Sequence, residues 1–349
     1  MLWATDDIRI EAIKPLIPPA ILMEELPLDD TASELIALSR RHIGDCLQGR
    51  DQRLVCIVGP CSIHDPKAAL DYAGRLKKEA DRLIDDLLIV MRVYFEKPRT
   101  SVGWKGLIND PFIDGSFAIN KGLRIARQLL VDVNAIGLPA GCEFLDTIMP
   151  QFLADLVSWG AIGARTTESQ IHRELASGMS CPIGFKNATN GNVQVAIDAI
   201  DAARHPHHFL SVTKQGVAAI VSTKGNTDCH MILRGGSNGP NDDVDTVAST
   251  AKRLTAKGLP HRIMVDCSHG NSLKVHSNQP TVAARVAAQR KTTDNAIFGL
   301  MLESNLVAGS QDSRHGPGSL VYGQSITDAC IGWEETVRVL EHLAIANKR

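Results

Sequence analysis

Residues 54–84 read LVCIVGPCSIHDPKAALDYAGRLKKEADRLI, which joins a strand pattern directly to a helix pattern. The segment at 54–60 is a short run of apolar and β-branched residues, typical of a buried strand. The segment at 66–84 places its apolar residues at helical spacing, which predicts an amphipathic helix. One strand followed by one helix is the unit from which parallel sheets are built.

The same unit recurs along the chain. Eight short apolar runs are expected to be strands, at 54–60, 87–94, 139–143, 161–165, 182–187, 230–234, 262–266 and 297–303. Amphipathic helical patterns separate most of them, which favours a parallel sheet. Two further runs, at 208–212 and 218–223, lie a short turn apart and predict an antiparallel hairpin inserted before the sixth strand.

The position of the polar residues distinguishes a closed barrel from an open sheet. Almost every run ends, on its C-terminal side, in a charged or metal-binding residue: Cys61, Arg92, Glu143, Arg165, Lys186, Arg234, Asp266 with His269, and Glu303. In a parallel barrel all these ends meet at one mouth. We therefore expect an α/β fold, a (β/α)8 TIM barrel. Residues 1–45 would be an N-terminal extension, and 46–349 the barrel with a β-hairpin insert at about 207–224.

Composition limits the classes of partner. The chain has 349 residues, and 37 Lys and Arg against 39 Asp and Glu give a net charge of -2. This charge predicts no general attraction for nucleic acid or for anionic membranes, so phosphate binding must be local. The N-terminus lacks a signal-peptide pattern, and no apolar stretch approaches the roughly 20 residues of a membrane span, so we expect a cytoplasmic protein. Eight cysteines without CxxC pairs indicate reduced thiols.

Basic residues gather at the predicted mouth of the barrel. Four strands end in such residues, and two nearby motifs, EKPRT and GWKG, contribute more: Arg92, Arg165, Lys186, Arg234, Lys97, Arg99 and Lys105. So many cations at one face of an acidic chain predict binding of several phosphate or carboxylate groups. Neither a P-loop nor a dinucleotide-binding glycine motif is present, which argues against a nucleotide site.

Four potential metal ligands belong to the same end of the barrel: Cys61, His269, Glu303 and Asp328. A thiolate, an imidazole and two carboxylates form a mixed set that suits divalent Mn, Fe, Co or Zn. Such a set leaves a position for substrate or water, as catalytic sites do. Taken singly, each residue also has an ordinary structural role, as a buried apolar residue, a hydrogen-bond donor or a surface acid.

Several long motifs resemble those of one enzyme family. They are GPCSIHDP (59–66), MRVYFEKPRT (91–100), GWKGLINDP (103–111), WGAIGARTTESQ (159–170), HRELASG (172–178), ILRGG (232–236), VDCSHGNS (265–272) and YGQSITDACIGWE (322–334). With them the chain, from about Asp6 to its last helix, resembles the type I 3-deoxy-D-arabino-heptulosonate 7-phosphate (DAHP) synthases. The resemblance implies a metal-dependent transferase that condenses phosphoenolpyruvate with erythrose 4-phosphate at the entry to aromatic amino-acid synthesis. It also implies a homodimer or homotetramer.

The resemblance assigns roles to individual residues. It implies metal ligation by the same Cys61, His269, Glu303 and Asp328. It places the phosphoenolpyruvate contacts on Arg92, Lys105, Ala164, Arg165, Lys186 and Arg234, and the aldose phosphate contacts on Lys97, Pro98, Arg99 and Thr100. The chemistry of the reaction further suggests a proton shuttle among Lys97, Glu143 and His269, without assigning the acid and the base. The sequence departs from the family pattern at Phe112, at Ser101 and in NATNG (187–191), which puts substrate affinity in question.

An aromatic amino-acid effector site is also implied, with the hairpin as one wall. Its expected residues are Asp6, Asp7, Pro150, Gln151, Ser180, Phe209, Ser211 and Val221. Ser211 favours phenylalanine as the effector, with tyrosine next, because tyrosine-sensitive relatives tend to have Gly there. The segment 1–45 would then serve regulation or oligomer contacts.

Three other functions compete with this interpretation. A related synthase that uses arabinose 5-phosphate would share the fold and the phosphate-binding cations. An aldolase could use Lys186 as a Schiff-base nucleophile. A sensor without catalysis would be expected to lack at least one metal ligand, whereas all four are present.

Overall fold

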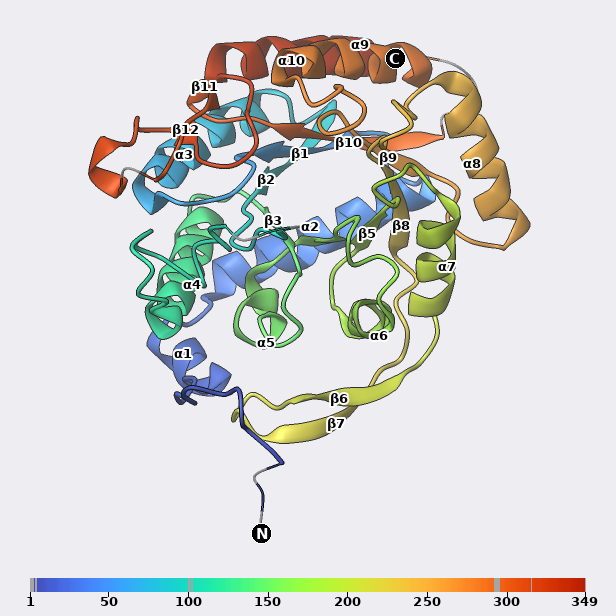
Figure 1. The fold of residues 1–349 in the computed structure, drawn as a ribbon. Helices are drawn as coiled ribbons and strands as arrows, with labels where there is room; N and C mark the ends of the chain where they lie inside the picture. Colours follow the sequence, from blue (N-terminus) through green and yellow to red (C-terminus); the bar gives the residue numbers. More distant parts are fainter. Residues whose placement is uncertain are drawn as a thin grey trace.

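Eight parallel strands form a closed barrel, with neighbours in the order β1-β10-β9-β8-β5-β4-β3-β2 (Figure 1). The computed structural model describes residues 3, 5–99, 101, 103–291, 296–314 and 316–348. The barrel strands are β1 (Leu54–Gly59), β2 (Leu87–Arg92), β3 (Ala140–Glu143), β4 (Trp159–Ile162), β5 (Ile183–Lys186), β8 (Cys229–Leu233), β9 (Ile263–Asp266) and β10 (Ile297–Glu303). The predicted TIM barrel is therefore confirmed.

Helices cover the outside of the barrel. They are α3 (Pro66–Arg82), α4 (Ile119–Ala135), α5 (Pro150–Leu153), α6 (Gln170–Gly178), α7 (Gln194–Ala203), α8 (Val244–Ala256), α9 (Gln279–Arg290) and α10 (Trp333–Asn347). Short 3-10 turns lie at Ala154–Leu156, His276–Asn278 and Pro317–Ser319, and β11 (Val307–Ser310) pairs with β12 (Gln324–Ser325). Asp65 caps α3 by accepting hydrogen bonds from two backbone amides of its first turn.

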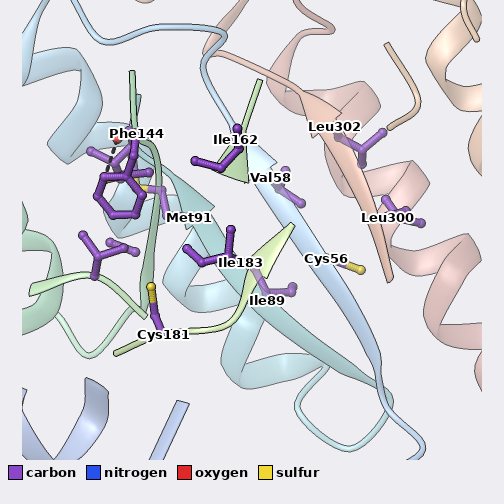
Figure 2. Close-up of a cluster of buried hydrophobic side chains, with 14 of the residues drawn as sticks. Cys56, Val58, Ile89, Met91, Phe144, Ile162, Cys181, Ile183, Leu300 and Leu302 are labelled. Atoms are coloured by element: carbon purple, nitrogen blue, oxygen red, sulfur yellow. Dashed lines mark hydrogen bonds between the residues drawn. The ribbon is translucent and has the colours of Figure 1, made fainter. Parts of the chain in front are cut away.

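Strand residues alternate between two apolar cores. Cys56 and Val58 face outward and join the large cluster between strands and helices, part of which is drawn in Figure 2. Val55 and Ile57 face inward and join a second cluster inside the barrel. This alternation follows from the two-residue period of a strand. Because both faces are buried, the strands are apolar along their whole length.

Two helices precede the barrel. They are α1 (Pro19–Glu25) and α2 (Asp30–Gln48), and α2 runs across the barrel end behind the plane of Figure 1. Ile43, Cys46 and Leu47 of α2 pack into the inner cluster. The expected division between residues 45 and 46 therefore falls inside one helix, and the end of that helix closes the base of the barrel.

The hairpin consists of β6 (His208–Val212) and β7 (Ala218–Ser222), paired antiparallel. It lies outside the barrel beside α5 and α6 in Figure 1, with the N-terminal segment nearby. Most strand bounds differ from the predicted ones by one or two residues. The largest difference is at β4, predicted over 161–165, which starts at Trp159 because that side chain fills the barrel interior.

No helix among the described residues is long and apolar enough to cross a lipid bilayer.

One substitution tests the packing of α4 against the loop before it. A methyl group at Gly122 would lie 2.2 Å from the backbone oxygen of Ile108, whereas one at Gly74 in α3 meets nothing within 4 Å. Helix propensity alone favours Ala over Gly by about 1 kcal/mol at either position. We expect Gly74→Ala to raise the melting temperature and Gly122→Ala to lower it, because overpacking costs about 1–3 kcal/mol. An equal rise in melting temperature in the two variants would contradict the close contact between Gly122 and Ile108.

A buried histidine predicts loss of stability in acid. His230 accepts a hydrogen bond from the Trp159 indole at 3.2 Å, and burial lowers the pKa of His230 from 6.5 to about 4. The unfolded chain therefore binds this proton at a higher pH than the folded chain does. The neutral His230 therefore contributes roughly 3 kcal/mol to the free energy of unfolding above about pH 6.5. This contribution is lost as the pH falls toward 4. His230→Gln should show a smaller fall in melting temperature between about pH 7 and pH 5 than the parent; an identical fall would assign the acid sensitivity to other groups.

Candidate active site

A pocket of about 600 Å³ opens at the carboxyl ends of the barrel strands. The predicted residues on its wall are Arg92, Lys97, Pro98, Arg99, Glu143, Ala164, Arg165, Lys186, Arg234, His269, Glu303 and Asp328. They come from seven strands and the loops after them, so the barrel closure brings together side chains that are far apart in sequence. Ser268, Ser272, Lys274 and His276 also line the pocket and were not predicted.

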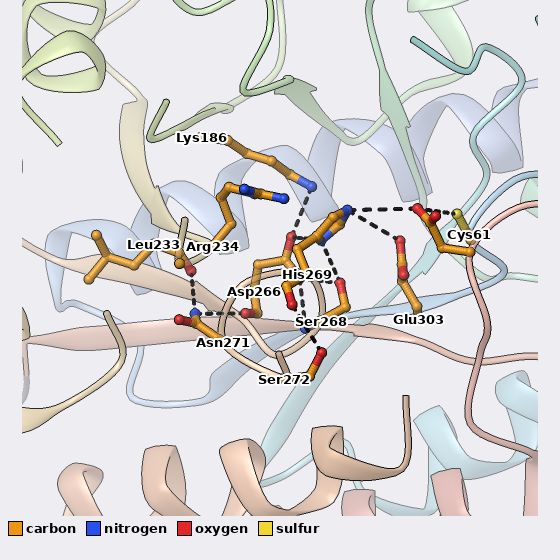
Figure 3. A network of polar contacts seen from close by, with 12 residues as sticks. Cys61, Lys186, Leu233, Arg234, Asp266, Ser268, His269, Asn271, Ser272 and Glu303 are labelled. Carbon is orange, nitrogen blue, oxygen red and sulfur yellow. Dashed lines mark hydrogen bonds and ion pairs between the residues drawn. The ribbon is translucent and has the colours of Figure 1, made fainter. Parts of the chain in front are cut away.

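Three of the four expected metal ligands form one tight group. The ligand atoms of Cys61, Glu303 and Asp328 all lie within 4.8 Å of one another. The Nε2 atom of His269 lies 3.9 Å from the Glu303 carboxylate and 4.0 Å from that of Asp328. The imidazole thus stands beside the group, with one ring nitrogen directed toward it (Figure 3).

The candidate metal ligands already form hydrogen bonds with the cationic side chains of Lys97 and Arg92. The Lys97 ammonium donates to the Cys61 sulfur at 2.9 Å and to Asp328 at 2.7 Å. The Arg92 guanidinium donates to Glu303 at 3.0 Å. Partial burial raises the pKa of the Asp328 carboxyl, but Lys97 outweighs this effect and the pKa lies well below its usual range. A carboxylate held ionised beside a thiol fits the coordination of a divalent cation.

Cys61 is a buried thiol. Burial, together with the nearby Glu303 carboxylate, raises the pKa of the Cys61 thiol to about 11. The thiol donates to Asp328 over 3.4 Å. Metal binding would therefore have to displace a proton from this sulfur.

Asp266 positions both His269 and Lys186. Its buried carboxylate lies 3.0 Å from Nδ1 of His269 and 2.9 Å from the Lys186 ammonium, as Figure 3 shows. Burial raises the pKa of Asp266, but Lys186 and His269 outweigh it and hold the pKa well below its usual range. Because Nδ1 is engaged, Nε2 is the ring nitrogen left to face a metal. The backbone of His269 has φ 54°, in the left-handed region that few side chains adopt.

The Lys186 contact bears on the Schiff-base alternative. Lys186 is the counterion of a buried carboxylate. A Schiff-base nucleophile must instead be a neutral amine. The geometry therefore favours an anion-binding role for Lys186.

Neighbouring residues hold the Arg92 guanidinium in place, and one of its nitrogens can still donate a hydrogen bond to a ligand. Its Nε and Nη2 donate to the backbone oxygens of Pro60 and Cys61, both at 3.1 Å. Its planar group lies 3.8 Å from the centre of the Tyr94 ring. The buried Nη1 finds no hydrogen-bond partner among the residues that the structure describes. A buried unpaired donor is costly, so a ligand acceptor fits there.

The loop after β2 forms another part of the wall. The Arg99 side chain is exposed and donates to the backbone oxygen of Trp104 at 2.8 Å. Lys105 is held beside Lys97 by a backbone hydrogen bond, but its exposed side chain is not part of the pocket wall. Thr100 lies outside the described residues. Glu143 also lies on the pocket wall, close to Gly163: a methyl group at residue 163 would be 2.3 Å from the Glu143 carboxylate, which would have to shift.

A second pocket, of about 530 Å³, lies between the barrel helices and the hairpin. Six of the expected effector residues line it together: Pro150, Gln151, Ser180, Phe209, Ser211 and Val221. Its charged residues, which were not predicted, are Arg40, Asp155 and Lys214. Asp6 and Asp7 are exposed and do not line this pocket within the same chain.

One supporting residue of the metal group has no signal in the sequence. Gln279, at the start of α9, is fully buried. Its amide donates to the backbone oxygen of Glu303 at 2.9 Å and accepts from the backbone nitrogen at 2.8 Å. Nothing in the local pattern distinguishes this glutamine from others, because its partner is 24 residues away.

Comparisons with known proteins agree with this geometry. The chain is 58% identical over 348 residues to the Phe-sensitive phospho-2-dehydro-3-deoxyheptonate aldolase of Escherichia coli K12, covering 100% of this chain and 99% of that protein. It is 56% identical to the tyrosine-inhibited enzyme of Schizosaccharomyces pombe, covering 98% of this chain and 92% of that protein. The solved structure of the aldolase from Francisella tularensis superimposes with a TM-score of 0.94 at 55% identity, covering 97% of this chain and 98% of that one. Residues 26–341 match the profile of the DAHP synthetase I family, and the chain belongs to that family.

Proposed function

We propose that this protein is a DAHP synthase, a transferase that condenses phosphoenolpyruvate with erythrose 4-phosphate and water to give DAHP and phosphate. This is the first step of the shikimate pathway to the aromatic amino acids. The observation that carries the proposal is one pocket whose wall contains the strand-end cations together with Glu303 and Asp328, which are grouped with the buried Cys61. The family and its relatives support the same activity.

Phosphoenolpyruvate has two anionic groups, and the pocket offers cations for both. Arg165, Lys186 and Arg234 bind the phosphate, and Arg92 binds the carboxylate through its spare Nη1 donor. Fixed cations of this kind orient the substrate and offset the charge on the departing phosphate. The second substrate lies against Lys97, Pro98 and Arg99, with the Arg99 guanidinium on its phosphate.

A divalent Mn, Fe, Co or Zn ion held by Cys61, His269, Glu303 and Asp328 would supply a Lewis acid for the aldehyde oxygen. The protein residues do the rest. Bond formation joins the methylene carbon of phosphoenolpyruvate to the aldehyde carbon, and the Lys97 ammonium delivers a proton to the former aldehyde oxygen, which becomes the new hydroxyl. Glu143, buried on the pocket wall, accepts a proton from the water that adds to the phosphate-bearing carbon, after which phosphate leaves.

Replacing the thiol ligand tests the metal site. Cys61→Ala is expected to lower metal affinity by more than about a hundredfold and to abolish turnover, because a direct ligand is lost. Cys56→Ala is the matched control, since Cys56 is buried in the outer core, away from the pocket. Metal content after dialysis and phosphate release with and without chelator provide the two measurements. A Cys61→Ala protein that keeps full activity in the presence of chelator would refute the role.

We further propose that the pocket beside the hairpin binds an aromatic amino acid that inhibits the enzyme. Phe209, Ser211 and Val221 form its inner wall, and Arg40, Lys214 and Asp155 supply charges that match a carboxylate and an ammonium group. Ser211 favours phenylalanine over tyrosine. The relatives themselves are named as Phe-sensitive and tyrosine-inhibited. Asp6 and Asp7 join such a site only if another copy of the chain supplies them.

Filling this pocket should remove inhibition without loss of catalysis. Val221 lines the pocket, whereas Ala218, on the same strand, is exposed on the opposite face. Val221→Trp is expected to raise the inhibitory phenylalanine concentration at least about tenfold, equivalent to a loss of about 1.4 kcal/mol of binding. Ala218→Trp should retain the parental inhibition curve. Inhibition is measured by titrating each protein with phenylalanine, tyrosine and tryptophan. A parent protein that none of the three amino acids inhibits would refute the proposal.

We also propose that the protein forms a homodimer or a homotetramer. Leu210 and Ile220 are opposite each other in the hairpin and are 85% and 75% exposed. An exposed apolar pair of this kind suits burial against another copy of the chain.

A further inference from the structure

The carboxyl ends of β5, β8 and β9 are joined by three buried asparagines, Asn187, Asn241 and Asn271. They are 0%, 8% and 3% exposed. Each follows one of these strands in the chain and lies below the pocket that contains Lys186, Arg234 and His269. We call these three residues the asparagine clasp. Three hydrogen-bonded amides in one buried network rigidify the segments they join.

The clasp holds the backbone of Arg234 from both sides. Asn187 accepts from the Arg234 nitrogen at 2.8 Å and donates to the Gly235 oxygen at 2.9 Å. Asn241 accepts from the Gly235 nitrogen at 2.7 Å. Asn271 donates to the Leu233 oxygen at 3.1 Å, shown in Figure 3. With the backbone bond from the Gly270 nitrogen to the Arg234 oxygen, every backbone polar group from the Leu233 oxygen to the Gly235 oxygen has a partner outside its own segment.

The three amides also bond to one another. Asn241 donates through its side chain to Asn187 at 3.1 Å and through its backbone to Asn271 at 2.8 Å. Asn271 donates in addition to the backbone oxygen of Asp266 at 2.9 Å. Asp266 in turn holds Lys186 and His269. The clasp therefore connects the backbone of a phosphate-binding arginine to the carboxylate that orients a lysine and a metal-facing histidine.

Close backbone packing makes the arrangement rigid. A methyl group at Gly235, which has φ +67°, would lie 2.5 Å from the backbone of Gly270. A methyl group at Gly270 would lie 2.4 Å from the backbone nitrogen of Gly236. Only glycine allows these loops to approach so closely, and the amides of the clasp satisfy the polar groups that this approach buries.

We propose that Asn187, Asn241 and Asn271 are positioning residues that fix the spacing of Lys186, Arg234 and His269 for the phosphate of phosphoenolpyruvate. This inference rests on the proposed function, because it takes that phosphate as the ligand of Lys186 and Arg234. None of the three touches the substrate. They act through the backbone of Arg234 and through Asp266, and a small displacement of such binding groups is enough to weaken an oriented contact.

The test compares asparagine variants in the clasp with an asparagine variant at the other end of the barrel. Asn241→Ala and Asn187→Ala remove clasp bonds, and the double variant tests whether the two act as one unit. The control is Asn226→Ala: Asn226 is a buried asparagine outside the pocket whose amide donates to the backbone oxygens of Ala176, Met179 and Cys181. Its loss removes four side-chain hydrogen bonds to described residues, as many as the loss of Asn187 and twice as many as the loss of Asn241, without touching the clasp. Calorimetry gives Kd for phosphoenolpyruvate, phosphate release gives KM for each substrate, and melting temperature measures the structural cost.

We expect Asn241→Ala and Asn187→Ala to raise Kd and KM for phosphoenolpyruvate about tenfold or more, with KM for erythrose 4-phosphate changed less than about twofold. The double variant should be little worse than the more affected single one. Asn226→Ala should lower the melting temperature by a similar amount and leave Kd for phosphoenolpyruvate unchanged. If Asn241→Ala fails to fold, the isosteric Asn241→Asp replaces it in the test. This variant keeps the acceptor for the Gly235 nitrogen and loses the donor to Asn187. It should show an intermediate loss of affinity for phosphoenolpyruvate.

Two results would overturn the clasp: parental phosphoenolpyruvate affinity in every folded clasp variant, or an equal loss of affinity in Asn226→Ala. A parent protein that binds phosphoenolpyruvate but releases no phosphate with erythrose 4-phosphate would instead count against the proposed function. Phosphoenolpyruvate binding still tests the clasp in that case.

Discussion

The candidate site depends on one buried carboxylate, that of Asp266. It is fully buried at the end of β9, yet its pKa is held well below the usual range, because Lys186 and His269 lie about 3 Å away. An unpaired charge at this depth would be strongly unfavourable. The pairing allows the interior of the barrel to hold a negative charge, and that charge fixes the Lys186 ammonium and the His269 imidazole at the wall of the candidate pocket. Removal of either partner would leave the other groups without a fixed position.

The two ends of the barrel serve opposite purposes. At the base, α2 and the inner cluster with Trp159 and Phe298 exclude water with apolar groups. At the mouth, Arg92 and Glu303 are paired at 3.0 Å while both are almost fully buried. Buried ion pairs add little net stability, since desolvation offsets their attraction. The apolar base must therefore supply the stability that the charged mouth does not, which is consistent with a barrel that separates folding from catalysis along its axis.

The sequence predicted the architecture and most of the site because both depend on periodic or strand-end patterns. Eight apolar runs placed all eight strands, and the polar residue after each run marked the mouth. The supporting residues were not predictable in this way. Gln279 and Asn241 act through contacts with segments distant in sequence, and their residue types are common on surfaces. Lys105, which the resemblance places in contact with phosphoenolpyruvate, is exposed and lies outside the pocket wall, and its substrate contact stays a prediction.

The two pockets are built from different parts of the chain. Barrel strands and the loops that follow them line the candidate active site, whereas α2, α5, α6 and the hairpin line the second pocket. The hairpin is not part of the barrel sheet, so its residues can change without altering strand packing. This separation gives a physical reason why members of one family carry names with different effectors. The segments still touch: the buried Glu96, next to Lys97, accepts from the backbone nitrogens of Leu145 at 3.2 Å and Asp146 at 3.1 Å, just before Thr147 and Pro150 of the second pocket. These hydrogen bonds connect the segment before the second pocket to the loop that holds Lys97.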